Sequence, residues 1–494
     1  MMSEEEEPML PCLYDNCQTA LNATAGPVAV DDANDSILMS RESLRKLLDY
    51  RTYTRRWFVL LVVCLLNTSN ALLWLSFAPV ADQISQYFHI SLDKINWLSL
   101  VYLIVGVPFG LCTTWMLDFC GLRTCLILSA WLNMLGSIIR FFSVLLVDRS
   151  EVITFILLMI GQTLCALAQP LVLFAPTKVA ALWFPENQRT TANMLASVAN
   201  PFGIMLANLL SPIIVTDKSY IPLMLGIYSI PATLACILAT AGIREKAPPT
   251  PPSASALSST SEPFWTGMKM LFQNRAYVLL MCCFGVGCGI FTAFSTLLEQ
   301  ILCVRGHSNF FIGLCGALFI ALGMVGAALF GVYVDKTKRF MEVVKINFCL
   351  TALASIGFAL VSRMTRSTTA EGLVVVVCAL FGLFGISIYP VCMELAVECS
   401  YPVGEATSAG LLFVSGQVQG IVFIVLLQVL AKPLSEVDFS KCLTSLDAPK
   451  DWMISTLVMA GICSVGACSF VLFFHTRYKR IHKEEAGSSR GTDS

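Results

Sequence analysis

Aromatic and polar side chains interrupt the apolar runs of this chain at positions where they could hold a solute. Trp74, in NALLWLSF, follows Asn70 by four residues, so both project from one face of a helix. An indole in the middle of an apolar helix could form one wall of a cage for an organic cation, because its ring face attracts positive charge. A tryptophan that faces lipid is the alternative. The pair therefore suggests binding of a solute, and the spacing alone leaves both interpretations open.

Amide side chains recur in the same kind of run. Polar groups at membrane depth usually face a cavity or another helix. Hydrogen bonding between helices, worth roughly 0.6 kcal/mol each, is the alternative to a role in binding. The residues concerned are Asn67, Asn70, Gln162, Gln169, Asn193, Asn200, Asn208, Gln417 and Gln419.

Charged residues cluster where one apolar run ends. Residues 331–339, GVYVDKTKR, place Asp335 just before Lys336, Lys338 and Arg339. An aspartate there can pair with a neighbouring helix and with cations at the same surface. Simple anchoring of the helix end by positive charge is the alternative.

The sequence lacks the residues that proton pumping, haem binding and catalysis would need. No Asp, Glu, Lys, Arg or His lies in the middle third of a predicted span, which favours a uniporter or a gradient-driven exchanger over a proton pump. All four histidines fall in loops or at span ends, so a haem iron has no obvious ligand. Walker loops, zinc motifs and catalytic triads are missing. We expect no enzyme activity, no catalytic residue, no metal and no cofactor.

Composition places these residues in a membrane. The chain has 494 residues, of which 56% are hydrophobic and 13% charged, and its mean hydropathy is +0.73. Apolar runs of about 20 residues suffice to cross the bilayer as helices. The predicted spans are 57–80, 95–117, 124–147, 152–176, 191–215, 221–243, 277–302, 309–334, 343–362, 371–394, 406–431 and 452–475. This is an all-α integral membrane fold with twelve transmembrane helices.

The distribution of Lys and Arg predicts the orientation. Twenty-two of these residues lie on the N-terminal side of the membrane and ten on the other, out of 32 in total. Both termini should therefore be cytoplasmic. The plasma membrane is the expected location; an endolysosomal membrane is the alternative, because EEEPML loosely resembles an acidic sorting signal. Cys303 and Cys442 both fall on the external side and could pair there.

A Pro/Ser-rich segment divides the spans six and six. The predicted organisation is a disordered N-terminal tail (1–56), a first half (57–243), a linker (244–276), a second half (277–475) and a C-terminal tail (476–494). The two halves repeat each other: TTWMLDFCGLR follows the second span as GVYVDKTKR follows the eighth, and FAPVADQI in the first span matches FSTLLEQI in the seventh. We expect the halves to be pseudo-symmetric.

These repeats resemble the major facilitator superfamily, whose loop signature is G-x-x-x-D-[RK]-x-x-[RK]-[RK]. The second copy fits it, and the first departs from it with Thr114 and Phe119. The resemblance implies a cytoplasmic latch whose ion pairs hold one access state. The residues expected to form it are Asp118, Arg123, Gly331, Asp335, Lys336, Lys338 and Arg339.

More narrowly, SNALLWLSFAPVADQI, VAALWFPENQRTTAN, FSTLLEQI and ECSYPVGEATSAGLL resemble solute carrier family 49, the relatives of the feline leukaemia virus subgroup C receptor. The resemblance implies transport of choline or ethanolamine, of haem, or of pyridoxine. For a choline-type site it implies that Trp74, Gln169 and Gln417 hold the ligand. The aromatic residue expected on the seventh span is replaced by Thr292, so one wall of the cage is missing unless Phe291, Phe294 or Tyr389 supplies it.

We therefore expect a uniporter that moves a small organic solute, such as a choline- or ethanolamine-like cation, by alternating access. The expected substrate-binding residues are Trp74, Gln169, Gln417, Asn70, Thr292 and Tyr389. A haem or porphyrin transporter of the same family, or a non-transporting receptor on a carrier fold, is the alternative. The expected partners are the small-molecule substrate and the lipid bilayer, without nucleic acid, for a monomeric protein.

Overall fold

The computed structural model describes residues 52–147, 149–244, 264–364, 366–400, 403, 405–433 and 449–476. Within them, twelve helical segments are long and apolar enough to cross a membrane, as the sequence predicts. Residues 1–51 of the predicted N-terminal tail, residues 245–263 of the linker and residues 477–494 of the C-terminal tail lie outside the described residues.

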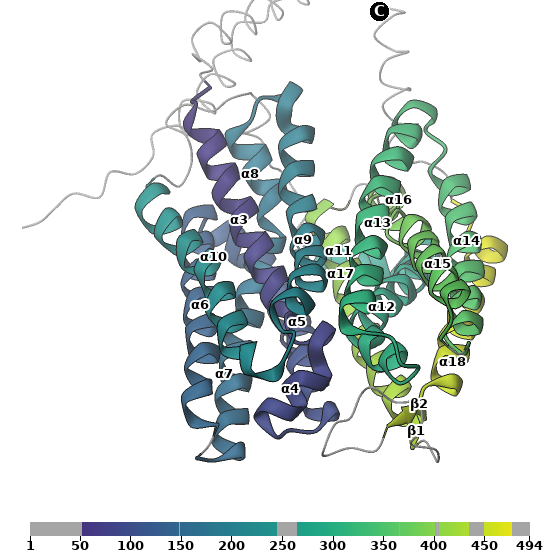
Figure 1. Cartoon of the computed structure of the whole chain (residues 1–494). Coiled ribbons are helices and arrows are strands. Elements are labelled where there is room, and N and C mark those ends of the chain that lie inside the picture. Colours follow the sequence, from purple (N-terminus) through teal and green to yellow (C-terminus); the bar gives the residue numbers. More distant parts are fainter. Residues whose placement is uncertain are drawn as a thin grey trace, which may run out of the picture.

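The helices form two bundles that lie side by side (Figure 1). The first contains α3 (Arg55–Leu75), η1 (Ala78–Val80), α4 (Ala81–Phe88), α5 (Leu92–Phe119), α6 (Leu122–Phe142), η2 (Ser143–Leu146), α7 (Glu151–Leu173), α8 (Ala175–Trp183), α9 (Glu186–Ile214), η3 (Lys218–Tyr220) and α10 (Ile221–Gly242). We call the end of the molecule where α3 begins and α18 ends the terminal end, and the other the opposite end; they are upper and lower in Figure 1.

The second bundle contains α12 (Arg275–Cys303), α13 (Asn309–Thr337), α14 (Phe340–Val361), α15 (Thr368–Gly385), α16 (Ile388–Ser400), α17 (Glu405–Leu430) and α18 (Met453–Phe473). A short antiparallel pair, β1 (Lys432–Pro433) and β2 (Lys450–Asp451), lies at the opposite end. One further helix, α11 (Phe264–Gln273), falls inside the predicted linker, so this part of the linker is helical.

The packing of the helices repeats between the bundles. In the first, α3 packs on α9, α5 on α7, and α6 on both α7 and α10. In the second, the equivalent helices do the same: α12 packs on α17, α13 on α15, and α14 on both α15 and α18. The bundles meet along two equivalent pairs, α5 with α17 and α9 with α13. This arrangement is the two-half fold that the sequence repeats predict.

The residues that cap the starts of the helices also repeat between the two bundles. Ser91 caps α5 and Ser308 caps the equivalent α13, each accepting a hydrogen bond from a backbone N–H of the first turn. Ser150 caps α7 and Ser367 caps the equivalent α15 in the same way. A serine at this position satisfies a backbone donor that the helix cannot satisfy itself. The caps therefore fix where these four helices begin at the opposite end.

Three membrane segments continue beyond the predicted spans, reaching Phe88, Trp183 and Ser400. In the first, α3 ends at Leu75, η1 follows with Pro79 in its first turn, and α4 extends the segment. Proline has no N–H to donate, so it fits the first turn after a break. The predicted ends were wrong here because the continuing helices are less apolar than the runs before them.

Arg140, which lies within the predicted span 124–147, is fully buried on α6 inside a membrane segment. Its guanidinium donates to the backbone oxygen of Leu73 (3.0 Å) and to the Ser76 hydroxyl, and lies 4.4 Å from the centre of the Phe77 ring. These contacts place a positive charge at the C-terminal end of α3, where the membrane segment is interrupted and the helix dipole makes a positive charge favourable. The apolar pattern could not show this role.

Candidate functional site

The residues predicted to bind substrate are mostly buried. Trp74, near the C-terminal end of α3, is 5% exposed, and Gln169 on α7 and Gln417 on α17 are each 8% exposed. Among the described residues, neither the Trp74 Nε1 atom nor the Gln417 Oε1 atom has a hydrogen-bond partner. Other buried polar atoms of the described residues, among them both amide atoms of Gln162, also have none.

Gln417 lies where the two halves meet. A β-carbon placed on Gly106 of α5 would lie 3.6 Å from Gln417 Cδ, so the glutamine packs against the backbone of the other half. One turn along α17, a β-carbon on Gly420 would lie 3.3 Å from Leu103 of α5 and 3.7 Å from Thr292 of α12. The α5–α17 contact therefore brings Gln417 and Thr292 to one junction.

Gln169 lies at a similar depth to Gln417. The Phe174 and Phe413 rings meet edge to face across the halves, with centroids 5.4 Å apart. Gln169 precedes Phe174 by five residues on a helix that runs toward the terminal end, and Gln417 follows Phe413 by four on a helix that runs away from it. Both glutamines therefore lie about one helical turn from this contact, toward the opposite end.

The other predicted binding residues make different contacts. The Asn70 amide donates to Asn133 Oδ1 and to the Cys165 backbone oxygen, both at 2.9 Å inside the first half. Thr292 Oγ1 donates to the Cys288 backbone oxygen at 2.9 Å. Tyr389 is 40% exposed, and its ring centre lies 5.4 Å from that of Phe284. Asn70 therefore bonds between helices through its N–H groups, while its buried Oδ1 atom has no partner among the described residues.

Two of the residues considered as substitutes for the missing wall lie in an aromatic cluster. Phe294 is fully buried against Phe319, Phe358 and Phe381 within the second half. Phe291 stacks on Phe319, with ring centroids 5.7 Å apart. Phe294 is thus held in the core of its own half.

The charged loops predicted to form the latch lie at the terminal end. The side chains of Asp118 and Asp335 lie outside the described residues. Lys336, Lys338 and Arg339 are exposed, and Gly331 has open space where a β-carbon would lie.

The latch residues that have described partners contact their own half. Arg339 makes an exposed ion pair with Glu342 at 3.4 Å. Arg123 Nε donates to the Ile243 backbone oxygen at 3.1 Å, joining the start of α6 to the end of α10. These contacts place the two arginines at the ends of helices, and the cytoplasmic latch itself stays a prediction.

Sequence reasoning missed a set of polar contacts between the halves at the opposite end. The Asn96 and Gln300 side-chain amides donate to each other, at 3.3 and 2.7 Å. Asn309 Nδ2 donates to Asp82 Oδ1 at 2.7 Å. Lys450 pairs with Asp93 at 3.0 Å. The repeat FAPVADQI and FSTLLEQI was the available signal, because it aligns Asp82 with Glu299.

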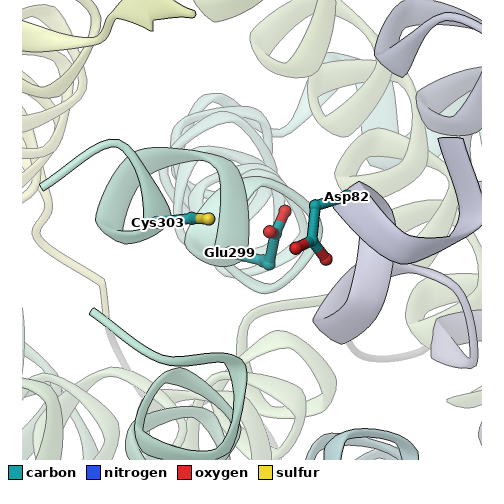
Figure 2. Close-up of side chains that lie close together, drawn as sticks. All are labelled: Asp82, Glu299 and Cys303. Atoms are coloured by element: carbon teal, nitrogen blue, oxygen red, sulfur yellow. The ribbon is translucent and has the colours of Figure 1, made fainter. Parts of the chain in front are cut away.

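Asp82 and Glu299 themselves lie next to each other in this region, beside Cys303 (Figure 2). One ligand atom from each of the three residues lies within 4.8 Å of the others, and all three side chains are buried. The Cys303 sulfur is in a disulfide bond, so it is not a thiolate that could bind a metal. Cys442, its predicted partner, lies outside the described residues.

The chain belongs to the major facilitator superfamily: the family model of that description matches residues 62–427. Solved structures of the same fold include a bacterial homologue of the human lysosomal transporter Spinster (TM-score 0.64, 15% identity, 85% of this chain and 97% of that one). A D-xylose–proton symporter also matches (TM-score 0.62, 15% identity, 87% and 99%). The protein is a multi-pass membrane transporter, and its family and fold are not those of enzymes.

Within this superfamily, the relatives place the chain in solute carrier family 49. It is 57% identical to "Solute carrier family 49 member A3" of Xenopus tropicalis, over 88% of this chain and 90% of the relative. The protein of the same name from Danio rerio is 54% identical over the same shares. The "Choline/ethanolamine transporter FLVCR2" of Rattus norvegicus is 31% identical over 75% of this chain and 68% of the relative.

Proposed function

We propose that this transporter moves a small organic cation of the choline or ethanolamine type by alternating access, driven by the gradient of the cation itself. The observation that carries the proposal is the pair of buried atoms without described partners, Trp74 Nε1 and Gln417 Oε1. A bound solute would satisfy both. Relatives about 30% identical that are named choline/ethanolamine transporters support the substrate class.

The chemistry of these side chains suits an amino alcohol. The face of the Trp74 ring attracts an ammonium group. The Gln417 carbonyl oxygen accepts a hydrogen bond from an N–H or O–H group, and the Trp74 N–H donates one to a hydroxyl oxygen. Gln169 adds a second amide at similar depth. Because these groups are neutral, they hold the cation without the strong attraction of a carboxylate, which would slow its release.

Thr292 affects which organic cation the proposed site would prefer. A threonine in place of an aromatic residue removes one cation–π contact, which is worth about 0.5–2 kcal/mol. Tyr389, on α16, would supply the remaining aromatic surface. A site with fewer rings and more amides should discriminate less against ethanolamine, whose ammonium can donate hydrogen bonds, than a complete aromatic cage would.

Alternating access needs a gate at each end of the site. We propose that the loop residues Asp118, Arg123, Gly331, Asp335, Lys336, Lys338 and Arg339 form the gate at the terminal end. The polar contacts of Asn96 and Gln300 would form the gate at the opposite end. From the distribution of Lys and Arg, the terminal end would face the cytoplasm, and the plasma membrane would be the site of transport.

The glutamines on α17 allow a matched test. Gln417→Ala should lower the uptake of labelled choline and ethanolamine about tenfold, because removing a hydrogen bond to a charged ligand costs about 1.5–3 kcal/mol. Gln419 donates to the Cys282 backbone oxygen within its own half, so Gln419→Ala is the control and should retain uptake. Both rates are measured per molecule at the cell surface. Equal uptake by the two variants would remove Gln417 from the site.

A further inference from the structure

Asp82 and Glu299 are two buried carboxylates that come from different halves of the molecule. Asp82 is the second residue of α4 and is 6% exposed; Glu299 is one turn before the end of α12 and is 2% exposed. Figure 2 shows the two carboxylates pointing toward each other, and their nearest oxygens lie within 4.8 Å. The pair therefore exists only while the halves are in contact at the opposite end.

The two carboxylates differ in their hydrogen bonds. Asp82 Oδ1 accepts from Asn309 Nδ2 and from the Gln83 backbone N–H, both at 2.7 Å. Among the described residues, the buried Glu299 Oε1 atom has no partner, and the Glu299 carboxylate faces one donor, the Asp82 backbone N–H. Donors stabilise an ionised carboxylate, so of two buried carboxylates the one with fewer donors is the one that protonation stabilises more. Asp82 is thus the better acceptor, and Glu299 is the better place for a proton.

Cations at the opposite end do not neutralise the pair. Lys450 pairs with Asp93, Arg305 with Asp451, and Lys94 lies over the Phe155 ring. His307, at the loop before α13, faces Glu371 at 3.9 Å, and burial lowers its pKa, which keeps it neutral. Lys218, on η3 beside α4, is exposed next to Asp217. Within the described residues, no Lys, Arg or His makes an ion pair with Asp82 or Glu299.

Two close carboxylates in a buried position cannot both keep a negative charge without a cation between them. A metal ion is a poor choice, because Mg²⁺ and Ca²⁺ take six or more oxygen ligands. Here the Asn309 amide presents its N–H to Asp82, and the Cys303 sulfur is in a disulfide. A proton needs only the two facing oxygens.

We propose that Asp82 and Glu299 together bind one proton when the halves are closed at the opposite end, with the proton on Glu299 and hydrogen-bonded to Asp82. When the halves part at that end, each carboxylate meets water separately and the proton returns to the solution on that side. The proton thus enters and leaves from one side and does not drive transport. Acidification of that side favours the closed arrangement, a consequence that rests on the proposed alternating access.

Infrared spectroscopy of the purified full-length protein tests the site without any substrate. At neutral pH, the wild type should show the carbonyl stretch of a protonated carboxylic acid. Glu299→Gln should lose this band, because the amide occupies the same space without an acidic proton. Asp93→Asn, which removes an exposed carboxylate at the same end, is the matched control and should keep it. Asp82→Asn should keep the band at a shifted frequency, since Glu299 changes its hydrogen-bond partner.

Three results would overturn the proposal. One is absence of the band from the wild-type protein at neutral pH, a result that does not depend on the folding of any variant. Another is a band that Glu299→Gln leaves unchanged. The third is loss of the band on addition of Mg²⁺ or Ca²⁺, which would identify a metal site. None of them depends on choline or ethanolamine, so a failure of the proton-site proposal can be distinguished from a failure of the proposed substrate class.

Discussion

A reagent that bridges positions 96 and 300 should stop transport. In the double variant Asn96→Cys with Gln300→Cys, a short thiol-reactive bridge with a cleavable link would join α5 to α12, where the two amides now bond across the halves. Transport needs these halves to part at the opposite end, so uptake should fall to the level of cells without the protein. Cleaving the bridge should restore it.

Two controls make this result specific. The single variants, treated with the same reagent, should retain uptake. This result would show that reaction of the reagent with the native cysteines does not itself stop transport. Arg366→Cys with Glu371→Cys places a bridge at the same end, where an ion pair at 2.9 Å joins two residues of one half. That bridge should leave transport intact. Continued uptake by protein that mass spectrometry shows to be bridged between 96 and 300 would contradict alternating access at this gate.

Trp74→Ala should have the largest effect among single changes in the proposed site. The variant loses the ring face that attracts the ammonium group, worth about 2 kcal/mol or more when desolvated, and an N–H donor besides. We expect the apparent KM for choline and for ethanolamine to rise about thirtyfold. Trp74→Phe keeps a ring without the N–H and should give an intermediate value. Kinetics of initial uptake in cells with matched surface levels provide the measurement.

Trp131 provides the control for this change. It lies on α6, is 44% exposed, and is the same residue type in another membrane segment. Trp131→Ala should leave the apparent KM unchanged. An equal rise in both variants would mean that loss of a tryptophan acts through folding, and an unchanged KM in Trp74→Ala would exclude the ring from the site.

The repeat of the two halves could be predicted because apolar runs and loop motifs recur in the same order. Helix ends were harder to predict where a proline breaks a segment. α4 and α8 follow such breaks and are less apolar than α3 and α7, so hydropathy alone stops short of them. The helix caps Ser91 and Ser308, by contrast, are visible in the sequence once the helices they start are known.

The contacts of single polar residues depended on neighbours that spacing cannot identify. Asn70 and Trp74 lie about 40° apart around α3, and Asn70 Nδ2 bonds to α6 and α7, while Asn70 Oδ1 and Trp74 Nε1 have no described partner. Their spacing indicates neither the contacts of the Asn70 N–H groups nor the atoms that are left without partners. The Asn96–Gln300 contact joins residues 204 positions apart, which no local pattern could indicate.

The most direct test of the proposed function uses purified wild-type protein in liposomes loaded with unlabelled choline or ethanolamine. Labelled solute added outside should accumulate by exchange, saturate with concentration, and be competed by the other amino alcohol. The same liposomes with Trp74→Ala should show little exchange at concentrations that saturate the wild type. Absence of exchange by folded wild-type protein with either solute would contradict the claim that this transporter carries a choline- or ethanolamine-type cation.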